Sequence, residues 1–371
     1  MAGIYVHIPF CKKRCIYCDF FSTTLLEKRE EYVQALLQEI AERKNEVGEP
    51  IRTIYIGGGT PSVLTSEQIC SILQAIGTTD AIEITMEANP ADISFEYLQA
   101  IRATGINRLS IGIQSFQDNL LTFLGRRHNA AQAIEAVHAA QQAGFTNISI
   151  DLMYAIPGQT KAQWITDIDT ALSLSVQHIS SYGLMYEEGT ALTRLRDAGQ
   201  ITPIDEDLEN EYYDTLCARL TNAGFVHYEV SNFLLPGYES KHNSSYWNNT
   251  PYVGVGAGAH SYIYNPHNNT LPVRSWNPDD LHAYISGILA HNLLRESETL
   301  TDSDQYNERI LLGLRTNQGI HLSDTDASRE RDEVILDFTR SNHLRVTEDG
   351  RIIATQKGLH ILNRIIEKLM I

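Results

Sequence analysis

The sequence predicts an α/β protein, a partial (β/α)6 TIM-like barrel with a small α+β module at its C-terminal end. Short β-rich segments alternate with amphipathic helical segments through the first two thirds of the chain. About six such units are present, fewer than the eight that close a full barrel. From Ser297 the pattern changes to helices followed by two alternating strands around an Asp-Gly turn, which indicates a separate module.

Each expected strand is a short run rich in β-branched or aromatic residues. These strands are Tyr5–Ile8, Thr53–Ile56, Ile82–Glu87, Arg108–Ile113, Asn147–Met153 and His178–Leu184. The segments between them carry apolar residues at helical spacing. The expected helices are Lys28–Lys44, Ser66–Ile76, Phe95–Ala103, Ala130–Ala143, Lys161–Ser173 and, after the last strand, Asp205–Ala223. Such repetition implies a parallel sheet with helices outside, so ligands should gather at the C-terminal strand ends.

The chain divides into three predicted parts. Residues 1–235 form the barrel with a cysteine loop after its first strand, and residues 236–296 form a connecting region rich in glycine and aromatic residues. Between 236 and 268 this region shows no clear periodicity. Residues 297–371 form a winged-helix-like module that ends in an amphipathic helix over 356–371. Its acidic character favours packing or partner contacts over DNA binding.

Composition excludes several classes of function. The formal net charge of -17 over 371 residues opposes a nucleic-acid footprint, which requires clustered Lys and Arg. No apolar run approaches the roughly 20 residues of a membrane-spanning helix. The chain opens directly into a strand without a secretory signal, so we expect a cytoplasmic protein that reaches a membrane only peripherally, through partners.

Three cysteines follow the first strand in the pattern Cys-x3-Cys-x2-Cys, at Cys11, Cys15 and Cys18. Three thiolates can hold three irons of a 4Fe-4S cluster and leave the fourth iron open to a small ligand such as S-adenosylmethionine. A zinc site normally needs a fourth ligand nearby, and a disulfide needs an oxidising compartment, so both alternatives fit poorly. The pattern therefore predicts an iron–sulfur site with these cysteines as metal ligands.

Glycines and polar side chains occur at successive expected strand ends. The glycine-rich turn Gly57–Ser62 follows the second strand, and its backbone can approach a ligand closely. Glu87, Gln114 and Asp151 end the next three strands, and Arg126 lies between the last two, suited to a carboxylate partner. For each residue alone, a hydrogen-bonding role in the barrel rim explains it equally well. Their joint occurrence favours a cofactor pocket.

Four motifs carry a resemblance to a known family. They are Tyr-x-His-Ile-Pro-Phe-Cys-x3-Cys-x-Tyr-Cys, Gly-Gly-Gly-Thr-Pro, Ser-Ile-Gly-Ile-Gln-Ser-Phe and Asp-Leu-Met-Tyr-Ala-Ile-Pro-Gly-Gln. Together they resemble the radical S-adenosylmethionine family around oxygen-independent coproporphyrinogen III oxidase. The resemblance implies a cluster on the three cysteines and no assigned catalytic residue. It implies S-adenosylmethionine contacts by Tyr5, Gly58, Gly59, Thr60, Glu87, Gln114, Arg126 and Asp151.

Two departures separate this chain from the oxidase pattern. The oxidase pattern is Cys-x3-Cys-x2-Cys-x-Cys, whereas Phe20 occupies the fourth position here, and the chain starts immediately before the cysteine strand.

His242 to Trp247 read His-Asn-x-x-Tyr-Trp, which is similar to the motif of the HemW-type haem chaperones. An imidazole can ligate haem iron, so His242 is a candidate ligand and His260 a second one. The alternative is that His242 and Trp247 anchor an ordered loop.

The leading hypothesis is a haem chaperone with a 4Fe-4S cluster and S-adenosylmethionine. The resemblance implies haem as cargo, membrane-bound respiratory haem proteins as acceptors, and dimerisation linked to the cluster, with no nucleic-acid partner. A second hypothesis is an active oxidase that decarboxylates coproporphyrinogen III. A third is radical chemistry on another substrate, which would release 5′-deoxyadenosine.

Overall fold

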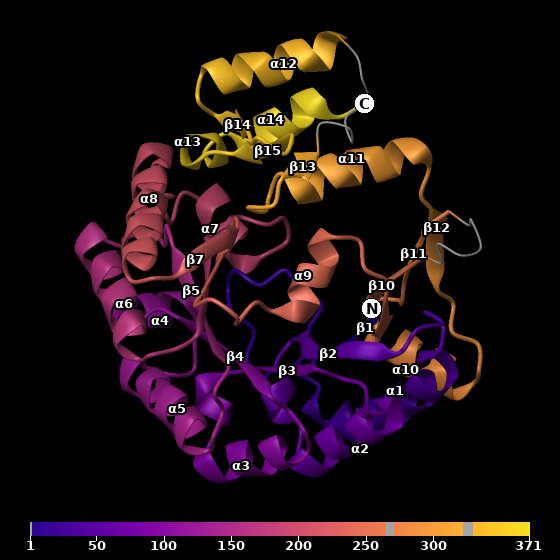
Figure 1. Cartoon of the computed structure of the whole chain (residues 1–371). Coiled ribbons are helices and arrows are strands. Elements are labelled where there is room, and N and C mark those ends of the chain that lie inside the picture. The colour runs from indigo at the N-terminus through magenta and orange to yellow at the C-terminus, as the bar shows by residue number, and fades with distance from the viewer. Residues whose placement is uncertain (1, 265–270, 322–328) are drawn as a thin grey trace.

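Six parallel strands form the centre of the molecule (Figure 1). The computed structural model describes residues 2–264, 271–321 and 329–371. The strands are β1 (Ala2–Ile8), β2 (Ile51–Gly58), β3 (Glu83–Ala88), β4 (Arg108–Gln114), β5 (Ile148–Tyr154) and β6 (His178–Gly183). Each pairs in parallel with the next, in sequence order. The predicted partial barrel is confirmed, and the strand ends differ from the prediction by only a few residues.

Helices cover the outside of this sheet (Figure 1). The predicted ones are present as α1 (Arg29–Arg43), α2 (Ser66–Ile76), α3 (Phe95–Ala103), α5 (Ala130–Gln142), α6 (Lys161–Ser173) and α8 (Glu206–Asn222). Short helices α4 (Asp118–Leu124) and α7 (Ala191–Asp197) were not predicted. Capping boxes fix where three of the helices begin, because Thr65, Asn129 and Thr160 each pair with a glutamine three residues later.

Additional strands extend the sheet beyond both ends of the barrel, giving twelve strands among the described residues. The extensions are β8 (Asn232–Leu234) and β7 (Val226–Glu229) beside β6, and β9 (Tyr252–Val255), β10 (His260–Ile263), β11 (Val273–Trp276) and β12 (Glu296–Thr299) beside β1. Strand β9 pairs with β1 in parallel, and the later ones are antiparallel.

The stretch without clear periodicity, 236–268, therefore contains regular structure. It holds α9 (Lys241–Trp247), β9 and β10, while residues 265–268 lie outside the described part of the chain. Glycine interrupts the alternation of side chains that would have indicated a strand here. A Cβ at Gly254 would lie 2.0 Å from the carbonyl oxygen of His260, so the close approach of the two strands requires glycine inside β9.

The C-terminal part builds its own three-stranded sheet, in the order β13-β15-β14. Its elements are α11 (Asp302–Gly313), β13 (Ile320–His321), α12 (Arg329–Arg340), β14 (Leu344–Val346), β15 (Arg351–Ala354), α13 (Gln356–Leu359) and α14 (Leu362–Leu369), and α10 (Leu281–Leu289) precedes them. The hairpin around the Asp-Gly turn is present, and the predicted last helix is divided into α13 and α14. Residues 322–328 lie outside the described residues.

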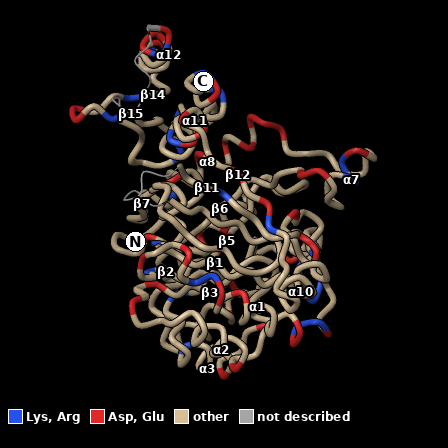
Figure 2. The backbone as a smooth tube through the Cα atoms, turned by 90° about the vertical axis from the view of Figure 1, so that its right-hand side faces the viewer, with Lys and Arg blue, Asp and Glu red and all other residues tan. Residues whose placement is uncertain are grey.

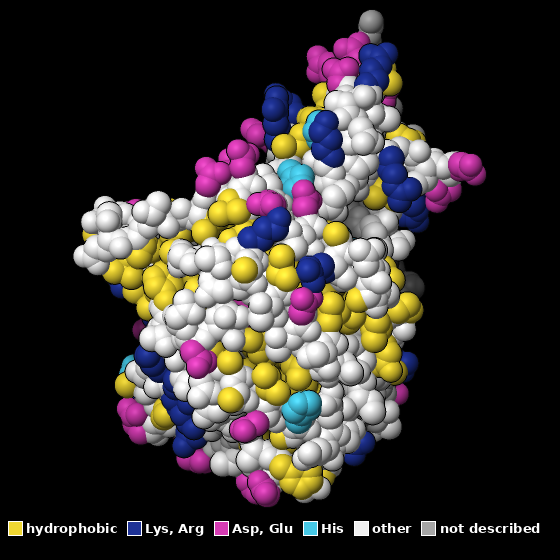
Figure 3. Space-filling model, turned by 90° about the vertical axis from the view of Figure 1, so that its left-hand side faces the viewer, with side chains coloured by type: hydrophobic (Ala, Val, Ile, Leu, Met, Phe, Trp, Pro, Cys, Tyr) yellow, Lys and Arg dark blue, Asp and Glu magenta, His cyan; other side chains and the backbone are white. Residues whose placement is uncertain are grey.

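Charged side chains of both signs are scattered over the surface. Figure 2 shows acidic and basic positions interspersed along the outer segments and the C-terminal helices. Figure 3 shows the same mixture on one whole face, with apolar atoms between the charges. In the described ranges, none of the helices combines the length and apolarity that crossing a bilayer would require.

Candidate functional site

The cysteine loop leaves the C-terminal end of β1 and is fixed at its base. The Cys11 amide donates to the Thr23 carbonyl at 2.8 Å, and the Thr23 amide donates to the Pro9 carbonyl at 2.7 Å. Burial raises the pKa of the Cys11 thiol and raises that of Cys18 to about 11. Nowhere in the described ranges do three His, Cys, Asp or Glu side chains converge as ligands of one ion. A 4Fe-4S cluster does not require three ligands around one ion, because each cysteine thiolate binds a different iron of the cluster.

The glycine-rich turn after β2 packs against the start of this loop. The Gly59 amide donates to the Ile8 carbonyl at 2.8 Å, and the Thr60 hydroxyl and Cys11 thiol share a hydrogen bond of 3.3 Å. A Cβ at Gly59 would lie 2.8 Å from the carbonyl carbon of Pro9. The turn therefore passes close to the first cysteine only because it has no side chain at this point.

Two partly buried carboxylates line the adjacent strand ends. Glu87 accepts hydrogen bonds from the Tyr55 hydroxyl at 2.8 Å and from the Gly58 amide at 3.1 Å. Asp151 accepts from the Ser110 hydroxyl at 3.2 Å. Burial raises the pKa of Glu87 to about 7, with repulsion from Asp151 adding to the shift, and burial raises the pKa of Asp151 to about 6. Both carboxylates can accept hydrogen bonds from amine or hydroxyl groups of a ligand.

Arg126 brings a partly buried positive charge to the cysteine loop. Its guanidinium donates to the Cys15 sulfur at 3.4 Å and to the Gly112 carbonyl. Its Nε is buried without a hydrogen-bond partner. A buried donor without a partner lowers the stability of the fold, unless a bound ligand accepts its hydrogen bond. Nearby, Gln114 has a φ of 72° where the pairing of β4 with β5 shifts register, a left-handed conformation that strains the backbone of a non-glycine residue.

Tyr5 reaches the same region from β1. Its hydroxyl forms a 3.0 Å hydrogen bond with Nδ1 of His7, whose Nε2 bonds the Phe21 carbonyl at 2.9 Å. Tyr5 also stacks on Tyr55, with ring centroids 6.2 Å apart. The structure therefore brings the predicted S-adenosylmethionine contacts to the strand ends around the cysteine loop.

His242 lies at the other end of the strands. It packs beside Thr53, near the start of β2, and its backbone amide donates to the carboxylate of Glu83 at the start of β3. The ring is buried, Nδ1 bonds the Thr53 hydroxyl at 3.0 Å, and Nε2 bonds the Tyr246 hydroxyl at 2.8 Å. Both ring nitrogens are engaged, so the geometry fits the anchoring alternative and leaves no free nitrogen for iron.

A cavity of about 630 Å³ opens beside the cysteine loop. Its lining residues are Tyr5, His7, Asp19, Phe20, Phe21, Tyr246, Tyr252, Gly258, His260, Trp276, Asn277, Pro278, Asp279 and Glu296. Tyr252 and Trp276 were missed from the sequence. The pairing of β10 with β11 brings Trp276 opposite His260, and the short run Val273–Trp276 is the only local signal that could have indicated this strand.

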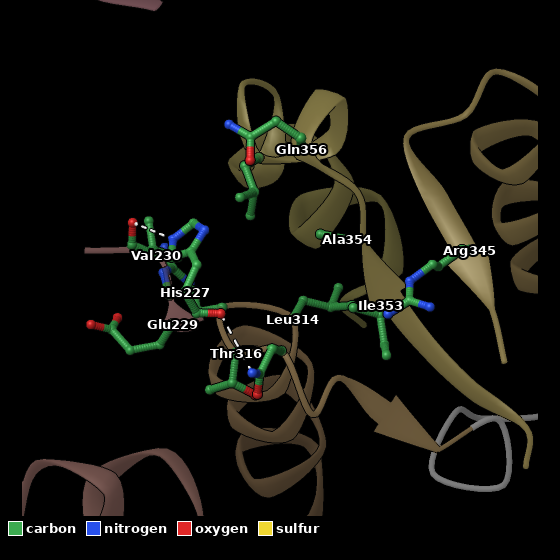
Figure 4. A pocket seen from close by; sticks show the side chains of 12 residues that line it. His227, Glu229, Val230, Leu314, Thr316, Arg345, Ile353, Ala354 and Gln356 are labelled. Atoms are coloured by element: carbon green, nitrogen blue, oxygen red, sulfur yellow. Dashed lines mark hydrogen bonds between the residues drawn. The ribbon is translucent and has the colours of Figure 1, made fainter. Parts of the chain in front are cut away.

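A smaller cavity, of about 150 Å³, lies where the C-terminal module meets β7 (Figure 4). His227, Glu229 and Val230 face it from one side, and Arg345, Ile353 and Gln356 belong to the module on the other. None of the predicted site residues lines this cavity, so the chemistry of the cysteine loop is located elsewhere.

A partial parallel barrel with a three-cysteine loop at the end of its first strand defines a protein of the radical S-adenosylmethionine class. The model of the Radical SAM superfamily matches residues 5–171. The chain is 36% identical to heme chaperone HemW of Lactococcus lactis subsp. lactis, over 99% of this chain and 97% of the relative. It is 38% identical to heme chaperone HemW of Bacillus subtilis, over 86% and 85%. The chain therefore belongs to the HemW family.

Among solved structures, coproporphyrinogen III oxidase (HemN) from Escherichia coli superposes with a TM-score of 0.83. The match covers 100% of this chain and 90% of that one, at 24% sequence identity. At this identity the likeness shows a common fold.

Proposed function

We propose that this protein is a haem chaperone, which binds haem and releases it to haem proteins. The observation that carries the proposal is the match to relatives named heme chaperones along nearly the whole chain. A match over only the barrel would have identified the superfamily without separating chaperones from enzymes, since many radical proteins share that fold.

The proposal includes a 4Fe-4S cluster held by Cys11, Cys15 and Cys18. When bound, this cluster supplies an open iron for S-adenosylmethionine and the electron that can cleave its carbon–sulfur bond. The hydrogen bonds between the loop base and Thr23 hold the first cysteine in place. The unpartnered Nε of Arg126 is the structural feature that favours an anionic ligand beside the loop.

The cofactor contacts follow from the donors and acceptors at the strand ends. Arg126 would bind the methionine carboxylate, Glu87 the amine, and Asp151 the hydroxyls or the amine. The remaining proposed contacts provide backbone groups or flanking side chains and are Tyr5, Gly58, Gly59, Thr60 and Gln114. In this account these residues bind and orient the cofactor, and none of them is assigned a catalytic step.

Partners and location complete the proposal. Membrane-bound respiratory haem proteins would accept the haem, the protein would act in the cytoplasm, and two copies would associate when the cluster is present. Phe20 supports the chaperone over the oxidase, because it stands where the oxidase pattern has a fourth cysteine and its side chain is 65% exposed.

The experiment is a haem transfer assay under anaerobic conditions. Haem-loaded protein mixed with apomyoglobin should yield holomyoglobin faster than the spontaneous loss of haem to buffer explains. In parallel, reconstituted protein is incubated with coproporphyrinogen III, S-adenosylmethionine and a reductant, and no protoporphyrinogen IX should form. If coproporphyrinogen III is converted and haem is not transferred, the protein is the oxidase and the chaperone proposal is wrong.

A further inference from the structure

We propose that haem binds in the cavity beside the cysteine loop, with His260 as its axial iron ligand. The inference rests on the proposed function and goes beyond it by locating the cargo. His260 begins β10, on the sheet extension that the sequence did not predict.

The cavity has the size and lining that a porphyrin needs. Its volume of about 630 Å³ lies within the roughly 300–1,000 Å³ of small-molecule pockets. Six aromatic side chains line it besides its histidines, namely Tyr5, Phe20, Phe21, Tyr246, Tyr252 and Trp276. Their faces and edges can pack against a flat conjugated ring from several directions.

Hydrogen bonding distinguishes His260 from the two other histidines in and around this cavity. Both ring nitrogens of His7 and both of His242 are already engaged by neighbouring groups. The His260 ring makes no hydrogen bond within the described parts of the chain, and the residue is exposed. An iron ligand requires a free, neutral ring nitrogen that can reach the cavity. His260 alone among the three meets this condition without breaking an existing bond.

The neighbouring strand orients the His260 ring. Trp276 lies directly across from it in the β10–β11 pair, and the two rings stack with centroids 5.7 Å apart and planes 21° apart. This stacking restricts rotation of the imidazole. The residue is exposed as a whole, but desolvation of its ring and the positive charge of Arg274 lower the pKa of His260, against an opposing effect of Glu298. This direction favours the neutral ring.

The charges around the cavity explain how the haem would lie and leave. Three carboxylates, from Asp19, Asp279 and Glu296, are among the lining residues, and that set includes neither lysine nor arginine. Haem propionates would be repelled by these side chains, so they would point out of the opening into water. A ligand held by one axial bond and ring packing, without ion pairs on its propionates, dissociates more readily than one clamped at both ends. Easy release suits a protein that transfers its cargo.

In this arrangement His242 acts through Tyr246. The Nε2 of His242 holds the Tyr246 hydroxyl, and the Tyr246 ring lines the cavity. His242 is therefore a positioning residue: its replacement should loosen one wall of the site without changing the iron ligand.

The test combines anaerobic haem titration with spectroscopy of the iron. His260→Ala should weaken haem binding by at least about tenfold, a loss of about 1.4 kcal/mol, and should abolish the histidine-ligated ferric spectrum. Added imidazole should restore that spectrum, because the variant leaves the ligand position open. His260→Cys should replace it by a thiolate spectrum. His282→Ala removes an exposed histidine on α10 and serves as the matched control.

The outcomes separate the site from the function. If the wild-type protein does not bind haem at a defined stoichiometry, both the proposed function and this inference are wrong. Stoichiometric wild-type binding with an unchanged spectrum in His260→Ala would overturn the site alone. The site would also be overturned if Tyr246→Phe or His242→Ala lost the histidine-ligated spectrum while His260→Ala kept it. Circular dichroism checks that these variants are folded.

Discussion

At Gly59 two backbone segments come so close that only a hydrogen atom fits between them. Replacing Gly59 by Ala would place a Cβ 2.8 Å from the backbone of Pro9 and 2.9 Å from that of Ile8. We expect Gly59→Ala to destabilise the fold by about 1–3 kcal/mol and to lower the iron content after reconstitution. Urea denaturation and iron analysis measure these two effects.

Gly77→Ala provides the control for this prediction. Gly77 has a φ of 85° and nothing within 4 Å of its Cβ position, so Ala there costs about 1–2 kcal/mol from the backbone alone. It should leave iron content unchanged. Equal iron content in the two variants would show that the turn does not shape the cysteine loop.

Because of Glu87, the unfolding free energy of the protein should fall as the pH rises. Its pKa in the native protein is about 7 against an ordinary value near 4.5, so between these values the native state holds more protons than the unfolded state. Its contribution to stability is then lost as the pH rises through about 7. From pH 5 to 8 the unfolding free energy of the wild type should fall by about 2–3 kcal/mol more than that of Glu87→Gln.

Urea midpoints of the two proteins at several pH values test this, without cluster or cofactor. Asp151 titrates in both proteins, but its charge repels that of Glu87, so the difference between the two profiles includes this coupling as well as the proton of Glu87. Parallel pH profiles for wild type and Glu87→Gln would contradict the raised pKa.

Individual site residues differ in how far the sequence could place them. The sequence already places the three cysteines together, because they share one short loop, and their role as cluster ligands stays a prediction from that spacing. The role of His242 was not, because its motif says nothing about which groups face its two ring nitrogens. Thr53, which bonds Nδ1, lies 189 positions away in the chain. Only the folded structure brings such distant partners together.

One buried carboxylate on helix α1 bonds several groups of the sheet extension and of α10. Glu39 is fully buried and accepts hydrogen bonds from Arg43 at 2.7 Å, Asn277 at 2.7 Å, Tyr284 at 2.7 Å and the Gly256 amide at 2.8 Å. Glu39→Ala would leave the buried Arg43 without this partner. We expect it to cost about 3–5 kcal/mol of unfolding free energy.

Glu42→Ala, one turn along the same helix, is the matched control. Its side chain is 44% exposed in a surface pair with His291, so its removal should cost at most about 1 kcal/mol. Denaturant midpoints of the two variants give the comparison. Similar losses would show that the Glu39 network contributes no more than a surface contact.

Elements with a regular period were predictable, and those built by distant pairing were not. The helix α2 begins and ends where its pattern and its capping residues indicate. Strand β9 is four residues long and contains a glycine required by its neighbour. Its place beside β1 depends on contacts with residues about 250 positions earlier, which a local pattern does not encode.

The whole molecule places the cysteine loop beside the cavity that we propose for haem. Asp19, Phe20 and Phe21 follow the last cysteine directly and line the cavity. Loss of the cluster should therefore disorder one wall of the haem site. We expect a triple variant of Cys11, Cys15 and Cys18 to Ala to lose the brown chromophore and to bind haem more weakly than wild type.

Visible absorption, iron content and haem titration of this triple variant measure both effects. Cys70→Ala is the control, because Cys70 lies on α2, away from the loop. A cluster that persists in the triple variant would remove the basis for these ligands. Unchanged haem affinity after cluster loss would show that the two sites are independent.

Haem binding by this protein is tested by an anaerobic haem titration of the reconstituted chain, followed by its Soret absorption. We expect saturation at one haem per chain with a histidine-ligated spectrum. A linear rise without saturation, with the spectrum of free haem, would contradict it.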